Sequence, residues 1–307
     1  MTLPVVEAAM DDLRLAHREL LRVVDSLSDA DWERAVPYGE WTVKDLVAHC
    51  IGDMSPSGVG LILAGVLTPQ FIADTARMFD IRTRNAALKL TEEHLPVLAY
   101  SVPMGPEYDL HVEDWLWHGY HDRQHADDIR RALELDWRPE PLTFVPEIEA
   151  TFRTLSRYRE GFLRAVYSVA EDAWDEAGPD PGWTYRDTLA HVASNGLRIQ
   201  TRLRDLLGQH DEAELEALRD WDGWNRRAVE ERRGRPVSEL VDELAASRHE
   251  TLRLLSRVGP ELLSAPITMS DGSTANVLEY IDMFTAHEAG HAAQLIPASR
   301  ARRWHTA

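Results

Sequence analysis

The sequence is poor in cysteine and in long apolar runs. Its single cysteine, Cys50, excludes an intrachain disulfide framework and any CxxC metal or redox site. Metal ligands would therefore have to be His, Asp or Glu. No stretch approaches the roughly 18 apolar residues that a membrane span needs, and residues Met1 to Leu13 carry acids where a secretory signal carries a basic cluster. We therefore expect a cytoplasmic protein with no membrane partner.

Basic residues are outnumbered by acidic ones. The chain has 33 Lys and Arg against 52 Asp and Glu, a formal net charge of −19. This balance argues against nucleic acid as a partner, because phosphate binding relies on Lys and Arg. A hydrophobic content of 44% is nevertheless that of packed cores, and 307 residues accommodate two ordinary domains. We expect a globular protein whose partner is a small-molecule substrate.

What the sequence does contain is an internal repeat. The segment Leu21–His49 aligns with Leu163–His191 without a gap, so that one constant offset relates the two segments. Three rare residue types in one register indicate a duplicated domain. The landmarks that coincide are Trp32 with Trp174, Trp41 with Trp183, Thr42 with Thr184, Asp45 with Asp187 and His49 with His191.

Proline separates the two copies. Trp137–Pro146 holds three prolines over a short span, which break helices and suit a linker. We therefore divide the chain into a first copy at 1–137, a linker at 138–146 and a second copy at 147–307.

Both copies show the spacing of amphipathic helices. Apolar residues recur at helical intervals in Leu13–Leu27, Leu155–Val169 and Val237–Val258, and no alternating strand pattern competes. A Thr-x-x-Asp motif at Thr42 and Thr184 predicts a helix start, because the Thr oxygen can accept from a free backbone N–H. With last helices from near Glu107 to Leu135 and from near Thr274 to Ile296, the sequence predicts an all-α protein of two tandem four-helix bundles.

Each copy ends in an HxxxH motif on its last predicted helix. His121 and His125 form the first pair, and His287 and His291 form the second. Residues four apart lie on one face of a helix, so two imidazoles can reach one metal ion. Both pairs fall on an apolar stripe, where unpartnered polar groups cost roughly 1–3 kcal/mol each. A shared metal would satisfy both members of each pair.

The repeat supplies a third ligand for each pair. His49 completes the triad with His121 and His125, and His191 completes the triad with His287 and His291. Three histidines leave coordination positions open, as catalytic zinc sites do, and nickel or ferrous iron also accepts imidazoles. The stretch between the first two ligands is longer in the second copy than in the first, so the second copy has an insertion, which we place around 208–222.

Two other interpretations compete with a metal-dependent enzyme. The stretch from His287 to His291, with Glu288, also matches HExxH, in which a glutamate serves as base in metallopeptidases. Gln294 and Pro297, however, stand where the longer HExxHxxGxxH form requires glycine and histidine, and no acidic residue follows His291. Alternatively, the metal could only brace a non-catalytic bundle. A coordination position open to a cleft would favour an enzyme, and a fourth protein ligand would favour the brace.

The Trp-Thr-x-x-Asp-x-x-x-His segments, Trp41–His49 and Trp183–His191, together with the C-terminal HxxxH helices, resemble the DinB/YfiT-like superfamily. This superfamily includes mycothiol-dependent maleylpyruvate isomerases and bacillithiol transferases. The resemblance covers nearly the whole chain, once per copy. It implies a four-helix bundle with a divalent metal, often zinc or nickel, on the six histidines named above, and a low-molecular-weight thiol as a possible co-substrate in a transferase, isomerase or hydrolase reaction.

The tandem design also predicts how the copies meet. Single-copy proteins of this kind resemble bundles that pair as symmetric dimers, and an isologous contact uses the same surface on both partners. We therefore expect a monomer whose copies pack face to face with pseudo-two-fold symmetry. Near the triads, Asp53 and its counterpart Asn195 lie one turn after the first histidine and could orient it, whereas Cys50 points away and is expected to be a small core residue.

Overall fold

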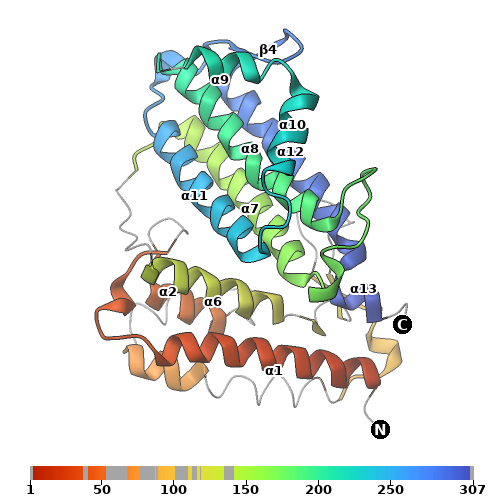
Figure 1. The fold of residues 1–307 in the computed structure, drawn as a ribbon. Coiled ribbons are helices and arrows are strands. Elements are labelled where there is room, and N and C mark those ends of the chain that lie inside the picture. The colour runs from red at the N-terminus through yellow and green to blue at the C-terminus, as the bar shows by residue number, and fades with distance from the viewer. Residues whose placement is uncertain are drawn as a thin grey trace. The chain divides into compact units, whose positions relative to one another are not determined.

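The chain divides into two helical units (Figure 1). The computed structural model describes residues 3–36, 41–52, 68–76, 87, 89–100, 110–112, 116–117, 119–134, 142–209 and 211–304. The first unit comprises 1–140 with 299–307, and the second comprises 141–298. In the described ranges, no helix is both long and apolar enough to cross a membrane. The predicted linker at 138–146 lies partly outside the described residues.

The second unit is a four-helix bundle. Its helices run side by side (Figure 1), with α12 packed along α7 and α11 packed along α8. Their apolar faces bury a core that includes Leu155, Tyr280 and Phe284. The four helices are α7 (Pro146–Ser168), α8 (Tyr185–Leu206), α11 (Val237–Leu255) and α12 (Val277–Leu295).

Shorter elements complete this unit. Between α8 and α11, two short helices occupy the region of the predicted insertion, and α10 packs against α8. They are α9 (Glu212–Ala217) and α10 (Trp221–Glu230). The remaining elements are η4 (Glu171–Ala173), η5 (Pro260–Leu262), η6 (Ile296–Ala298) and a hairpin of β3 (Ile267–Thr268) with β4 (Thr274–Ala275).

The first unit repeats the helical plan. Helix α6 packs along α1 and also contacts α2, and a further helical stretch covers 69–76. The three named helices are α1 (Pro4–Asp25), α2 (Val43–Gly52) and α6 (Gly119–Glu134). Smaller elements are η1 (Asp31–Glu33), η2 (Glu92–His94), β1 (Leu98–Tyr100), β2 (Leu110–His111) and the C-terminal α13 (Arg300–Trp304). In this unit Arg300 lies 3.5 Å from the Asp12 carboxylate.

The predicted helix starts at Thr42 and Thr184 are confirmed. In both copies the backbone N–H of the Asp three residues later donates to the Thr hydroxyl, at 3.3 Å for Asp45 and 3.1 Å for Asp187. Each carboxylate in return accepts from the Thr backbone N–H. This reciprocal capping satisfies two donors that a bare helix end would leave unpaired. It fixes where α2 and α8 begin, and with them the first histidine of each triad.

Two expectations about the last helices are wrong. Leu110–His111, predicted to be helical, pairs with β1, and α6 begins only at Gly119. Thr274–Ala275 pairs with β3, and α12 begins at Val277 after the Asn276 cap. Strands of two or three residues are too short to show alternation, which is why the sequence pattern missed both hairpins.

Candidate metal centres

The three histidines of the second copy converge on one point. Helix α8 supplies His191, and α12 supplies His287 and His291 on one face. The Nε2 atom of His287 lies 2.9 Å from Nε2 of His191 and 3.1 Å from Nε2 of His291. His191 is buried, whereas His287 and His291 are partly exposed. The triad therefore forms at the edge of the bundle rather than sealed inside it.

The three histidines of the first copy have the same arrangement. Helix α2 supplies His49, and α6 supplies His121 and His125. Nε2 of His121 lies 3.2 Å from Nε2 of His49 and 3.1 Å from Nε2 of His125. In this copy His125 is the buried member, and His49 and His121 are partly exposed. The structure thus brings together all six predicted residues, as two separate triads.

The donor set in each triad fits a divalent metal ion. Metal–nitrogen bonds of about 2.0–2.1 Å at tetrahedral angles place ligand nitrogens about 3.3 Å apart, close to the spacing found here. A metal also needs neutral imidazoles. Burial, followed by the neighbouring His291, lowers the pKa of His191 to about 3 and that of His287 to about 2. Burial likewise lowers the pKa of His125. At neutral pH these rings therefore present lone pairs rather than charges.

In the last histidine of each triad, His125 or His291, the outward nitrogen is Nδ1, which points away from the other two histidines. It has a different partner in each copy. His125 Nδ1 lies 3.1 Å from Oδ2 of Asp128, whose other oxygen accepts from Arg131 at 3.0 Å. His291 Nδ1 lies 2.6 Å from Oε1 of Gln294. An acceptor on Nδ1 fixes the tautomer in which Nε2 carries the lone pair that binds metal.

Comparisons with known families agree with this geometry. Residues 154–295 match the family model of the DinB superfamily, and residues 13–134 match that of the mycothiol maleylpyruvate isomerase N-terminal domain. The chain is a tandem of two DinB-type domains. No curated protein and no solved structure shows a significant match to it.

A tryptophan flanks the first histidine of each DinB-type domain. The Trp41 ring lies 5.2 Å from that of His49, and the Trp183 ring lies 5.1 Å from that of His191, at similar tilts of 54° and 50°. Both tryptophans are landmarks of the repeat, but the expectations from sequence did not place them against the histidines. Their identical spacing before His49 and His191 was the available signal.

Asn195 belongs to the surroundings of the second triad. Its amide nitrogen lies 3.2 Å from His287 Nδ1, and its Oδ1 is buried with no hydrogen-bond partner. The same amide nitrogen lies 3.1 Å from Nε2 of His287, so the amide is placed against the ring between its two nitrogens. The counterpart Asp53 lies outside the described residues. Cys50, as predicted, is part of the buried core.

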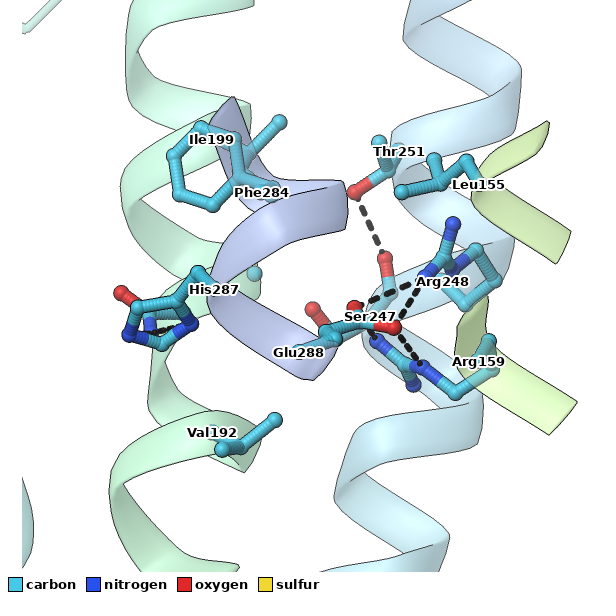
Figure 2. Close-up of a pocket in the computed structure, with 12 residues that line it drawn as sticks. Leu155, Arg159, Val192, Ile199, Ser247, Arg248, Thr251, Phe284, His287 and Glu288 are labelled. Atoms are coloured by element: carbon cyan, nitrogen blue, oxygen red, sulfur yellow. Dashed lines mark hydrogen bonds and ion pairs between the residues drawn. The ribbon is translucent and has the colours of Figure 1, made fainter. Parts of the chain in front are cut away.

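Glu288 faces away from the second triad. Figure 2 shows its carboxylate turned toward Arg159 and Arg248, opposite His287. Arg159 donates to it at 2.6 and 2.9 Å, and Arg248 donates at 2.9 Å. Burial alone would raise the pKa of Glu288, but the two guanidiniums outweigh it and hold the pKa below its usual value. The small cavity beside these residues, of about 20 Å³, has room for one water molecule rather than a substrate.

Asp122 occupies the matching position in the first DinB-type domain. It accepts from His17 Nδ1 at 2.8 Å, and the other ring nitrogen of His17 lies 2.8 Å from the backbone oxygen of Ala76. His17 aligns with Arg159 at the offset of the repeat. Each domain therefore has a charged contact between its first and last helices. In both, the acidic partner is the residue that directly follows the second histidine of the triad.

Proposed function

We propose that each histidine triad holds one divalent metal ion, and that the protein is a metal-dependent enzyme that acts on a small molecule with a low-molecular-weight thiol. The observation that carries this proposal is the convergence of three imidazole nitrogens in each domain. Zinc and nickel suit such a donor set best, and ferrous iron is a further candidate. The reaction class would be a thiol transfer, an isomerisation or a hydrolysis.

The bound cation would lower the pKa of a coordinated thiol or water toward neutrality. The chain's own residues would hold and orient the ion. In the second domain, His287 and His291 are partly exposed, so an incoming ligand would approach the metal from their side. Trp183 covers His191 on another side. The thiol is supported by the family matched at 13–134, whose name refers to mycothiol.

The metallopeptidase alternative is disfavoured by the position of Glu288. A general base must reach the water that it deprotonates. The Glu288 carboxylate instead accepts hydrogen bonds from two arginines on the far side of α12. A non-catalytic, metal-braced bundle stays the second candidate, and the first domain suits it better because His125 is held by a buried carboxylate.

Metal analysis of the purified full-length chain tests the proposal. We expect close to two equivalents of zinc or nickel, and identification of both ions by anomalous scattering in crystals. Addition of a thiol to cobalt-loaded protein should produce a thiolate-to-metal charge-transfer band. The proposal would be overturned by a chain that neither retains nor takes up a divalent metal.

We also propose that the protein is a cytoplasmic monomer. Its acidic composition, with a net charge of −19, argues against nucleic acid as a partner. Light scattering across a range of concentrations should give the mass of one chain, and cell fractionation should recover it with cytoplasmic markers. The face-to-face packing of the two domains stays a prediction.

A further inference from the structure

A buried arginine lies beside the second triad. Arg198 is on α8, two turns after His191, and only 7% of its surface is exposed. The centre of its guanidinium lies 3.6 Å from the ring centroid of Trp221 and 4.9 Å from that of Phe284. The two aromatic rings hold the cation through cation–π contacts. Its position is therefore fixed by packing.

No carboxylate neutralises this arginine in the part of the chain that the structure describes. Its Nη1 atom is buried and has no hydrogen-bond partner. Its polar neighbours are the Tyr280 hydroxyl and a second cation, Arg202. Burial is the main cause that lowers the pKa of Arg198, to about 10, so the group stays charged at neutral pH. Burying a charge without a partner is costly, and buried charges in folded proteins are normally paired.

The arginine and the triad are close neighbours. The charge of Arg198 contributes to the lowered pKa values of both His191 and His287, after burial and the other histidines. Phe284, which contacts the guanidinium, lies one turn before His287 on α12. Asn195, one turn before Arg198, has its amide nitrogen 3.1 Å from His287 Nε2. A ligand on the metal would therefore lie within the field of an unneutralised cation.

We propose that Arg198 binds the carboxylate of an anionic small-molecule ligand whose other end reaches the metal of the second triad. This inference rests on the proposed function and adds its substrate class. A carboxylate would supply the acceptor that Nη1 lacks and would neutralise the buried charge. Glu288 cannot do so, because its single charge is already shared by Arg159 and Arg248.

The repeat places no arginine at the corresponding position of the first domain. At the offset of the repeat, Pro56 stands where Arg198 stands in the second domain. Trp221, which holds the guanidinium, falls within 208–222, where we place the insertion that distinguishes the second copy. We therefore expect the first triad to bind anionic and neutral thiols alike, and it serves as the internal control.

The test uses the full chain loaded with cobalt(II) and two thiols of similar size, 3-mercaptopropionate and the neutral 3-mercaptopropan-1-ol. Both place a thiolate on the metal, and only the first carries a carboxylate. Binding is followed by the thiolate-to-cobalt charge-transfer band. We expect two phases for the anionic thiol, one tighter than the other by about tenfold, because charge-assisted hydrogen bonds are among the strongest. The neutral thiol should give a single weak phase.

Arg198→Met should abolish the tight phase, and Arg198→Lys should retain part of it. Arg204→Met is the matched control, because Arg204 is on the same helix but pairs with Glu250 and is partly exposed. It should change neither phase. The metal-free Arg198→Met protein should melt at the same temperature as the wild type or higher, since an unpaired buried charge has been removed.

Three results would count against the inference. If the metal binds both thiols equally in wild type, the anion site is wrong and the metal site stands. If Arg198→Met lowers the melting temperature and keeps the tight phase, Arg198 is a packing residue. If cobalt does not bind the second triad at all, the proposed function itself fails, and the inference fails with it.

Discussion

The two triads have the same ligands, three histidines each, but different surroundings. The outward nitrogen of His125 faces the carboxylate of Asp128, whereas that of His291 faces the neutral amide of Gln294. A carboxylate partner raises the basicity of a ligating imidazole, strengthens its bond to the metal and makes the metal less electrophilic. The difference therefore indicates a first site suited to holding its ion and a second suited to activating a ligand.

The carboxylate that follows the second histidine of each triad also has different partners in the two domains. In the first domain Asp122 is paired with His17, and burial, which alone would raise the pKa of Asp122, is outweighed by His121 and His17 so that the pKa falls well below its usual value. In the second domain Glu288 serves two arginines. Near the second triad, Arg159 and Arg248 thus outnumber the carboxylate that they share, while Asp180 is an acidic group that acts on His291.

The largest expected effect comes from variants that destroy one metal site and leave the other intact. His121→Ala with His125→Ala, and His287→Ala with His291→Ala, should each remove about half the bound metal, because two of three ligands are lost. Only the second pair of changes should abolish the tight phase of 3-mercaptopropionate binding. Elemental analysis and the cobalt titration measure the two outcomes. Loss of both ions from either double variant would show that the sites are not independent.

The next effect concerns the buried charges. Glu288→Gln leaves two partly buried guanidiniums without a carboxylate, and breaking a fully buried network of this kind typically costs about 3–5 kcal/mol, which sets the upper limit here. Asp122→Asn leaves a histidine that can become neutral, so its cost should be smaller. Calorimetry of the metal-free variants should show a larger shift for the second domain than for the first. Equal shifts would mean that the two contacts stabilise their domains equally.

The triads could be predicted from the sequence because their information is local and duplicated. An HxxxH spacing places two rings on one helical face, and the repeat identifies the third histidine. Asp128 and Gln294, three residues after the last histidine, were equally accessible, since that spacing lies on the same face. The Trp–His contacts were also encoded at constant spacing, but that spacing alone does not show that the two rings meet.

Other features depend on tertiary packing and could not be predicted. Arg198 and Trp221 are separated in sequence by the end of α8 and by α9, and they meet only because α10 packs against α8. Glu288 matched a peptidase motif by sequence alone. The side on which its carboxylate lies depends on Arg159 of α7 and Arg248 of α11, which donate hydrogen bonds to it.

A third prediction concerns the residues that face Nδ1 of His125 and His291, whose side chains are exchanged between amide and carboxylate. Asp128→Asn keeps a hydrogen-bond acceptor but removes the charge, and it should weaken metal binding at the first site by about 10-fold or more, within the range known for such partners. Gln294→Glu should strengthen metal binding at the second site for the converse reason. Competition with a chromophoric chelator measures both affinities. The comparison fails if the two substitutions shift affinity in the same direction.

The smallest expected effect concerns the helix caps, a feature in which the two domains should behave alike. Thr42 and Thr184 cap α2 and α8 through the same reciprocal hydrogen bonds with Asp45 and Asp187. Thr→Ala at either position removes one acceptor from the helix start and should cost about 1 kcal/mol.

Because the first histidine of each triad lies about two turns into the capped helix, fraying at its start should loosen both sites equally. Each variant should therefore lower the melting temperature of its own domain by a similar amount and weaken its metal site only slightly. Matching Thr→Ser variants keep the hydroxyl and should behave as wild type. A large loss of metal affinity in one domain alone would mean that this site depends on its helix start more than the shared geometry implies. The contrast between the two domains would then not come only from Asp128, Gln294 and Arg198.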